Sequence, residues 1–415
     1  MELRQYQNEI SEKGINILKE LKILYLAMEV RTGKTATSLN IAKLYNAKKV
    51  LFLTKKKAIK SILEDYNNFG FTFELVVINN ESLHLIKEND FDLLISDEHH
   101  RNGAFPKPNK TTKEIKKRFS KLPMIFLSGT PTPESYSQWY HQFWVSDNSP
   151  FMSKSFYEFA RHGFIKDKIK FLGYANVKDY SEVSEKGMVY ISSVMKRYVL
   201  SFTQEQAGFI TSVKENILKV KMKDITYKIA EQLKKENIFK GNNDMIIADT
   251  GAKLMSKLHQ LYSGTCILES GKSFIVDKSK AIFIYDHFKN KKIAIFYKFQ
   301  EELNLLKDTF KDSLCFDLET FNTTNKNIAL QIVSGREGIS LKEADYLVYF
   351  NIDFSAVSYW QSRDRLTTMD RKENSIYWIF AEKGIEESIY KSVMNKKNYT
   401  LSIFKKDSHG FKIPK

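Results

Sequence analysis

"AMEVRTGKTATSL", residues 27–39, is the stretch that decides which fold we expect for the chain. Gly33, Lys34 and Thr35 stand between a short apolar run and a segment with helical spacing. A strand-to-helix turn of this kind can hold nucleotide phosphates through backbone N–H groups and a lysine, and magnesium through a hydroxyl. The usual pattern has its first glycine where this chain has Met28. The loop alone therefore leaves a nucleotide site and an ordinary turn equally open.

Short apolar runs alternate with longer amphipathic segments around this loop, which is the pattern of a parallel sheet covered by helices. In the first block we expect strands over 23–28, 48–54, 73–78, 91–96 and 124–128. A second alternating block begins near residue 280, with candidate strands over 291–297, 328–334, 345–351 and 375–381. The sequence therefore predicts an α/β chain with two parallel-sheet lobes.

The segment between the two blocks has a different character. It lacks the alternation, and apolar positions in 224–239 and 251–264 recur at helical spacing. We expect a first lobe over 1–145, a mostly helical insertion over 146–275 and a second lobe over 276–415.

Composition limits the classes of partner and compartment. The chain has 415 residues with 65 Lys and Arg against 49 Asp and Glu, a net charge of +16. Such an excess favours a polyanionic partner such as nucleic acid, although a general lysine bias would also produce it. The two cysteines are too few for a disulfide framework and fit a reducing cytoplasm. The first residues have no apolar signal core, and no apolar run is long enough to span a bilayer.

A second motif, "FDLLISDEHH" over 91–100, is an apolar strand that ends in Asp97 and Glu98. A parallel sheet presents its ligands at the carboxyl edge, where these residues lie. Phosphoryl transfer to water needs one acid to hold magnesium and another group to orient the attacking water. Asp97 suits the first role and Glu98 the second. His99 and His100, taken alone, read as solvent-facing or packed histidines, and no further ligands suggest zinc.

Two more segments complete the chemistry. "IFLSGTPTPES" over 125–135 ends its strand in Ser128 and Thr130, whose hydroxyls could sense the γ-phosphate and pass its state to a neighbouring domain. "SYWQSRDRLTTMDR" over 358–371 offers arginines that can stabilise the charge of a transition state. Two lobes that close around ATP would couple its hydrolysis to domain motion.

With these motifs in this order, the chain resembles superfamily-two helicases and translocases over nearly its whole length, and more narrowly the Swi/Snf-type DNA translocases. "LRQYQNEI" is similar to their adenine-recognising motif, which implies a base contact by Gln7 with Arg4 close by. The loop motif, often without its first glycine in this group, implies nucleotide contacts by Thr32, Gly33, Lys34 and Thr35. Thr35 and Asp97 would hold Mg²⁺.

The resemblance continues into the nucleic-acid and second-lobe motifs. "VLFLTKKKAIKSILEDY" implies contacts of Thr54 and Lys57 with a strand backbone. "IVSGREGISLKEADYLVYFN" implies a nucleic-acid contact by Ser334 and a nucleotide contact by Gly338. In the middle, "ISSVMKRYVL" and "GAKLMSKLHQLYSG" look like Swi/Snf-type segments.

The arginine motif departs from the family pattern. "WQSRDRL" places Arg365 where the family has its first arginine, but the second position, three residues later, is Thr368. Either Arg363 or Arg371 replaces it, or one arginine is missing and turnover is slower. Our site assignment includes Arg363 as a nucleotide contact.

What the resemblance implies is two RecA-like lobes with ATP and Mg²⁺ between them, and DNA, single-stranded, duplex or branched, held mainly by its backbone. An RNA helicase and a non-hydrolysing nucleic-acid-binding scaffold are the alternatives. One chain contains both halves of the ATP site, so we expect activity as a monomer without a membrane partner.

We expect the substitution Arg365→Ala to abolish ATP hydrolysis while sparing ATP binding, because the arginine would act on the charge of the transition state. Steady-state turnover and a nucleotide titration measure the two effects. Near-normal turnover would show that another arginine has this role.

Overall fold

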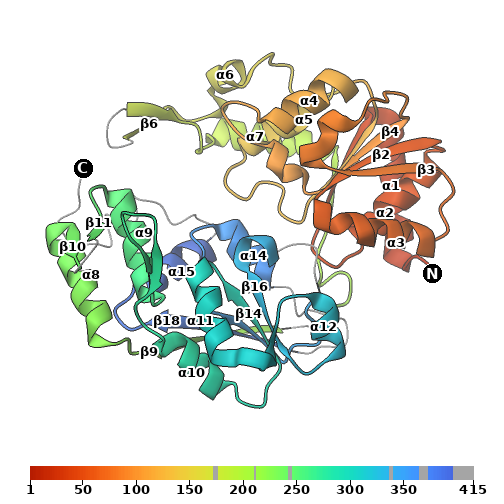
Figure 1. Cartoon of the computed structure of the whole chain (residues 1–415). Coiled ribbons are helices and arrows are strands. Elements are labelled where there is room, and N and C mark those ends of the chain that lie inside the picture. The colour runs from red at the N-terminus through yellow and green to blue at the C-terminus, as the bar shows by residue number, and fades with distance from the viewer. Residues whose placement is uncertain (172–175, 210–211, 242–244, 336–339, 364–372, 396–415) are drawn as a thin grey trace. The chain divides into compact units, whose positions relative to one another are not determined.

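The computed structural model describes residues 1–171, 176–209, 212–241, 245–335, 340–363 and 373–395. They form two compact units, Met1–Phe209 and Ile210–Lys415 (Figure 1). Each unit is built around one six-stranded sheet in which every neighbouring pair of strands is parallel. The prediction of an α/β fold with two parallel-sheet, RecA-like lobes is therefore confirmed.

The sheet of the first unit has the strand order β3-β2-β4-β5-β1-β8. Its strands are β1 (Ile23–Met28), β2 (Lys49–Thr54), β3 (Glu74–Asn79), β4 (Leu93–Ser96), β5 (Met124–Leu127) and β8 (Val199–Phe202). The five strands that the sequence predicts here are confirmed as β1 to β5. The helices are α1 (Gln5–Leu21), α2 (Lys34–Leu44), α3 (Ile59–Asn68), α4 (Lys110–Phe119), α5 (Gln138–Trp144), α6 (Phe156–Phe159) and α7 (Glu185–Met195).

Alternate residues of these strands enter two different apolar clusters. In β1, Ile23 and Tyr25 belong to one cluster, while Leu24, Leu26 and Met28 belong to the other. Successive side chains of a strand point to opposite faces of the sheet, so each face packs against its own layer. A sheet buried on both faces needs nearly continuous apolar strands, which is why the sequence reveals them as unbroken apolar runs.

The sheet of the second unit has the order β15-β16-β14-β17-β18-β9. Its strands are β9 (Ser212–Val220), β14 (Ile293–Tyr297), β15 (Leu314–Cys315), β16 (Asn327–Gln331), β17 (Tyr346–Tyr349) and β18 (Glu373–Ala381). The helices are α8 (Asp224–Glu236), α9 (Gly251–Tyr262), α10 (Ser279–His287), α11 (Gln300–Phe310), α12 (Leu318–Thr323), α13 (Ile332–Gly335), α14 (Ala356–Arg363) and α15 (Glu386–Met394). The four predicted strands of this block correspond to β14, β16, β17 and β18.

One carboxylate fixes the edge of this second sheet. Glu215 on β9 accepts hydrogen bonds from Tyr359 Oη at 2.8 Å, Trp378 Nε1 at 2.8 Å and Tyr390 Oη at 2.9 Å. These donors come from α14, β18 and α15. A single carboxylate thus ties β9 to elements more than 140 residues later in the chain.

The segment 146–275 differs from the prediction of a mostly helical insertion. It contains α6 to α9, but it also contains β8, which belongs to the sheet of the first unit, and β9, which belongs to the sheet of the second. It also holds the hairpins β6 (Lys168–Phe171) with β7 (Asn176–Asp179), β10 (Ile238–Lys240) with β11 (Met245–Ile247), and β12 (Thr265–Ile267) with β13 (Ser273–Ile275). Both β8 and β9 are edge strands, and polar residues interrupt their apolar positions, so no unbroken apolar run marks them. The predicted boundaries at 145 and 275 stay predictions.

His141 on α5 gives the first unit a pH-dependent stability. Its Nδ1 atom lies 2.7 Å from Ala104 O, and its ring stacks on Phe156 with centroids 5.7 Å apart. Burial lowers the pKa of His141 from 6.5 to about 4. The folded state therefore binds this proton less readily than the unfolded state, and the stabilisation present above pH 6.5 is lost as the pH falls towards 4.

We expect wild-type protein to lose about 2 kcal/mol of unfolding free energy between pH 7 and pH 5 relative to His141→Gln, which cannot take up that proton. Urea unfolding of both proteins at the two pH values measures the difference. Parallel losses in the two proteins would contradict a lowered pKa at His141.

Candidate nucleotide-binding site

The first turn of α1 packs against the loop between β1 and α2. Gly33 has a φ of +80°, and a Cβ atom there would lie 2.2 Å from Gln7 Nε2, so only glycine fits. Gln7 Nε2 donates to Gly33 O at 3.2 Å, and Gln7 Oε1 accepts from the backbone N–H of Arg4 at 2.9 Å. Gln7 is therefore buried beside the loop with its amide group engaged. Its contact with a base stays a prediction, as does that of the exposed Arg4.

The lysine of the loop is bound to the loop's own backbone. Lys34 Nζ donates to Met28 O at 2.8 Å and to Glu29 O at 3.1 Å. Thr32 Oγ1 donates to the same Glu29 carbonyl at 2.7 Å. Thr35 follows in the first turn of α2. Neutral carbonyl oxygens around an ammonium group are weaker acceptors than charged phosphate oxygens, which would compete for this lysine.

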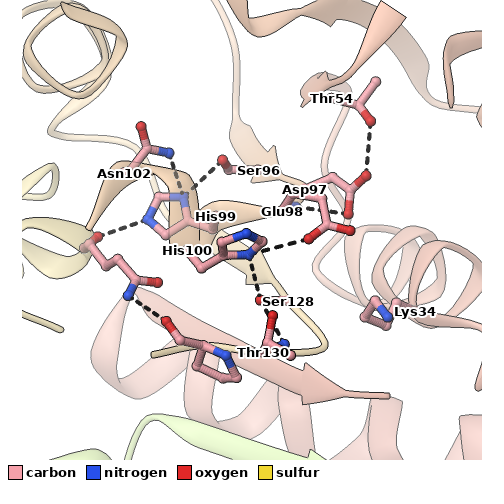
Figure 2. Close-up of polar contacts among 12 residues, drawn as sticks. Lys34, Thr54, Ser96, Asp97, Glu98, His99, His100, Asn102, Ser128 and Thr130 are labelled. Atoms are coloured by element: carbon pink, nitrogen blue, oxygen red, sulfur yellow. Dashed lines mark hydrogen bonds and ion pairs between the residues drawn. The ribbon is translucent and has the colours of Figure 1, made fainter. Parts of the chain in front are cut away.

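The carboxylates follow β4 at the same edge of the sheet (Figure 2). Asp97 Oδ2 accepts from Thr54 Oγ1 at 2.9 Å, and Asp97 Oδ1 accepts from the backbone N–H of Glu98 at 2.9 Å. Thr54 ends β2, which pairs with β4. Thr54 is fully buried and its hydroxyl orients Asp97, while its expected contact with a nucleic-acid strand stays a prediction. Lys57, in the short turn after β2, is exposed.

The Asp97 carboxyl group lies where negative charge is costly. Burial and, after it, the charge of Glu98 raise its pKa from 3.8 to about 6, although Lys34 and the Thr54 hydroxyl act in the opposite direction. A raised carboxyl pKa means that the ionised form is short of compensating positive charge. A divalent cation supplies that charge, so the donor set at Asp97 fits magnesium.

The two histidines after Glu98 have different surroundings. His99 is buried, with Nδ1 2.8 Å from Ser96 Oγ and Nε2 2.8 Å from Gln142 O. It stacks on Phe126 with centroids 3.7 Å apart, and burial lowers its pKa to about 3. His99 is therefore a neutral packing residue, as the packed alternative for this motif predicts.

His100, by contrast, links the carboxylate motif to the loop after β5. Its Nδ1 atom lies 3.2 Å from Glu98 Oε2 and 2.9 Å from Ser128 Oγ. Ser128 Oγ in turn accepts from the backbone N–H of Thr130 at 3.1 Å. Figure 2 shows this chain of contacts passing from Glu98 through His100 to Ser128. This role of His100 is not predictable from the sequence, because adjacent histidines after a strand do not reveal which one faces the site.

The loop after β5 also lies against the phosphate-loop candidate. A Cβ atom at Gly129 would lie 3.5 Å from Met28 O and 3.8 Å from Lys34 Nζ. The carboxyl ends of β1, β4 and β5 thus bring a lysine, two carboxylates and a serine hydroxyl together, as expected for ligand binding at the edge of a parallel sheet.

The predicted contacts of the second unit stay predictions. Gly338, Arg365, Thr368 and Arg371 lie outside the described residues. Ser334 is part of α13 and Arg363 is the last residue of α14, and each is placed by its backbone alone.

Comparison with known proteins adds a family match at the loop. Residues 1–74 match the family model described as type III restriction enzyme, res subunit. The resemblance to helicase-like ATPases is confirmed for this segment. It includes the Gln7 and Gly33-Lys34-Thr35 motifs and ends before the carboxylates. No curated protein matches the chain.

Two solved structures are similar to most of the chain. The SWI2/SNF2 ATPase core of Sulfolobus solfataricus in complex with dsDNA is 16% identical with a TM-score of 0.42, and the match covers 99% of this chain and 94% of that chain. The SWI2/SNF2 ATPase core domain of the same organism is 15% identical with a TM-score of 0.42, with coverages of 98% and 90%. Within the part of this chain that the structure describes, no helix combines the length and the apolar character needed to cross a membrane.

The Thr54 hydroxyl gives a test of the cation site. We expect Thr54→Val, which keeps the shape but removes the donor to Asp97, to raise the half-saturating Mg²⁺ concentration for nucleotide binding about tenfold or more. The reason is that a hydrogen bond to a charged group contributes roughly 1.5–3 kcal/mol. A Mg²⁺ titration at fixed nucleotide measures it.

Thr112→Val is the matched control for this test. Thr112 is equally buried, and its hydroxyl is bonded to the side chains of Asn102 and of Asn109, the N-cap residue of α4. Its loss should lower stability and leave the Mg²⁺ requirement unchanged. An unchanged requirement in Thr54→Val would exclude Thr54 from positioning the metal ligand.

Proposed function

We propose that the chain is a nucleic-acid-stimulated ATPase that converts ATP hydrolysis into movement on, or remodelling of, duplex or branched DNA. The observation that carries the ATPase proposal is the convergence of Lys34, Asp97, Glu98 and Ser128 at one edge of the first sheet. The family match over the loop supports the same chemistry.

Each group in this set has a distinct role in the proposed reaction. Lys34 exchanges its two carbonyl partners for phosphate oxygens. Asp97, held by Thr54, and Thr35 are the residues that would hold Mg²⁺. When bound, the metal neutralises charge on the phosphates and polarises the bond that breaks.

Glu98 is the group that orients the attacking water and accepts its proton. His100 lies against its carboxylate and fixes where that carboxylate can point. Because His100 also contacts Ser128 Oγ, a change at Glu98 during the reaction reaches the loop after β5 through one side chain. Ser128 and Thr130 are the residues that we assign to coupling.

DNA as the partner rests on two sequence features. The net charge of +16 favours a polyanion, and the Swi/Snf-like segments of the middle region favour DNA over RNA. The exposed Lys57 is suited to a phosphate contact that does not depend on base sequence. A non-hydrolysing scaffold would not require the complete set of lysine and carboxylates.

Steady-state ATP hydrolysis without nucleic acid and with single-stranded DNA, duplex DNA, a branched junction or RNA tests the proposal. We expect duplex or branched DNA to stimulate turnover most strongly. Lys34→Ala should remove both basal and stimulated turnover. Glu98→Gln should still bind ATP and lose at least about 100-fold in rate, the usual contribution of a general base.

The other outcomes are equally informative. No hydrolysis under any condition would favour the scaffold. Stimulation by RNA alone would make the chain an RNA helicase. Wild-type turnover in Glu98→Gln would remove Glu98 as the residue that orients the water.

A further inference from the structure

The chain leaves the first unit next to its candidate phosphate-binding loop. The last strand of the unit, β8, pairs in parallel with β1, and Phe202 stands opposite Met28 at the end of that pairing. The pairing extends one step into the loop, because the backbone N–H of Glu29 donates to Phe202 O at 2.9 Å. Residues 203–209 then lead towards the second unit. We call them the connection.

Gln204, near the start of the connection, donates two hydrogen bonds to the loop. The backbone N–H of Gln204 donates to the Glu29 carboxylate at 2.7 Å. The side-chain amide of Gln204 donates to Val30 O at 2.9 Å. Glu29 is the same residue whose carbonyl oxygen accepts from Lys34 and Thr32. One loop residue therefore holds the phosphate-binding lysine with its backbone and the connection with its side chain.

Helix α1, which carries Gln7, also contacts the end of β8. Tyr6, within α1, stacks on Phe202 with ring centroids 4.7 Å apart. Its hydroxyl donates to Thr32 O of the loop at 3.2 Å. The end of β8 is thus contacted both by the loop and by the helix that carries Gln7.

We infer that Gln204 is a positioning residue for the phosphate-binding loop, and that it couples the occupancy of the loop to the connection between the units. The inference rests on the proposed binding of nucleotide. When Lys34 leaves Glu29 O for a phosphate, the loop backbone changes at Glu29, directly before Val30, whose carbonyl oxygen holds the Gln204 side chain. The connection is covalent, so this coupling does not depend on how the two units are placed. By linkage, a shift in the connection alters nucleotide affinity by the same factor.

Amide hydrogen exchange of the connection tests this inference in the full-length protein with ADP and Mg²⁺ as the probe. Phosphates that bind the loop N–H groups restrict its opening, and Gln204 N–H is protected while Glu29 stays in place. At 100 times the Kd we expect the nucleotide to slow exchange of residues 203–209 at least about tenfold, below the roughly 100-fold limit for fully coupled opening.

Gln204→Ala removes the bond to Val30, and we expect it to reduce this slowing to less than about threefold at the same fractional saturation. Gln206→Ala is the matched control. Gln206 is the same residue type two positions later, and its amide oxygen accepts only from Thr203 N–H and hydroxyl among the described contacts. The control should respond to nucleotide as the wild type does.

The outcomes separate this inference from the proposed function. Calorimetric binding of ADP without any slowing in the wild type, or an equal slowing in Gln204→Ala, overturns the coupling and leaves the ATPase proposal intact. If Gln206→Ala reduces the slowing of exchange as much as Gln204→Ala does, the inference is also overturned, because any substitution in the connection would then have this effect. Absence of ADP binding to wild-type protein overturns the proposed function and the inference together.

Discussion

Parallel pairing of β1 with its neighbours is the constraint from which the candidate site follows. Because β4, β5 and β1 run in the same direction, the loops that leave them emerge at one edge. The parallel pairing and its register therefore suffice to bring the residues that follow these strands close together. A lysine, two carboxylates and a serine come together from segments about 30 residues apart or more.

The same constraint produces the electrostatic character of the site. A buried carboxylate at Asp97 beside a second one at Glu98 is unfavourable in itself, and one ammonium group on a neighbouring loop relieves it only in part. The cost of burying these carboxylates can be recovered when a ligand binds, since a divalent cation supplies the missing positive charge. The buried network around His99 then keeps the strand end rigid.

Much of this arrangement was accessible from the sequence. Buried parallel strands appear as unbroken apolar runs, so β1 to β5 and four strands of the second sheet were predicted. The positions of Lys34, Asp97, Glu98 and Ser128 follow from where those runs end. Edge strands β8 and β9 were not predicted, because polar residues interrupt their apolar positions and their partners lie far away in sequence. The roles of Thr54, His100 and Gln204 depend on which way a side chain turns, and residue type does not encode that.

The pairing of β9 with β18 joins the first strand of the second unit to its last. During synthesis β9 is translated about 160 residues before its partner β18, whereas β1 has already been translated when β8 is made. The first unit can therefore complete its sheet during synthesis, and the second must wait until Ala381 has left the ribosomal tunnel. Until then Glu215 has neither Trp378 nor Tyr390 as a donor. Premature termination anywhere before β18 would leave an open sheet edge, so the second unit cannot complete its fold until β18 has been translated.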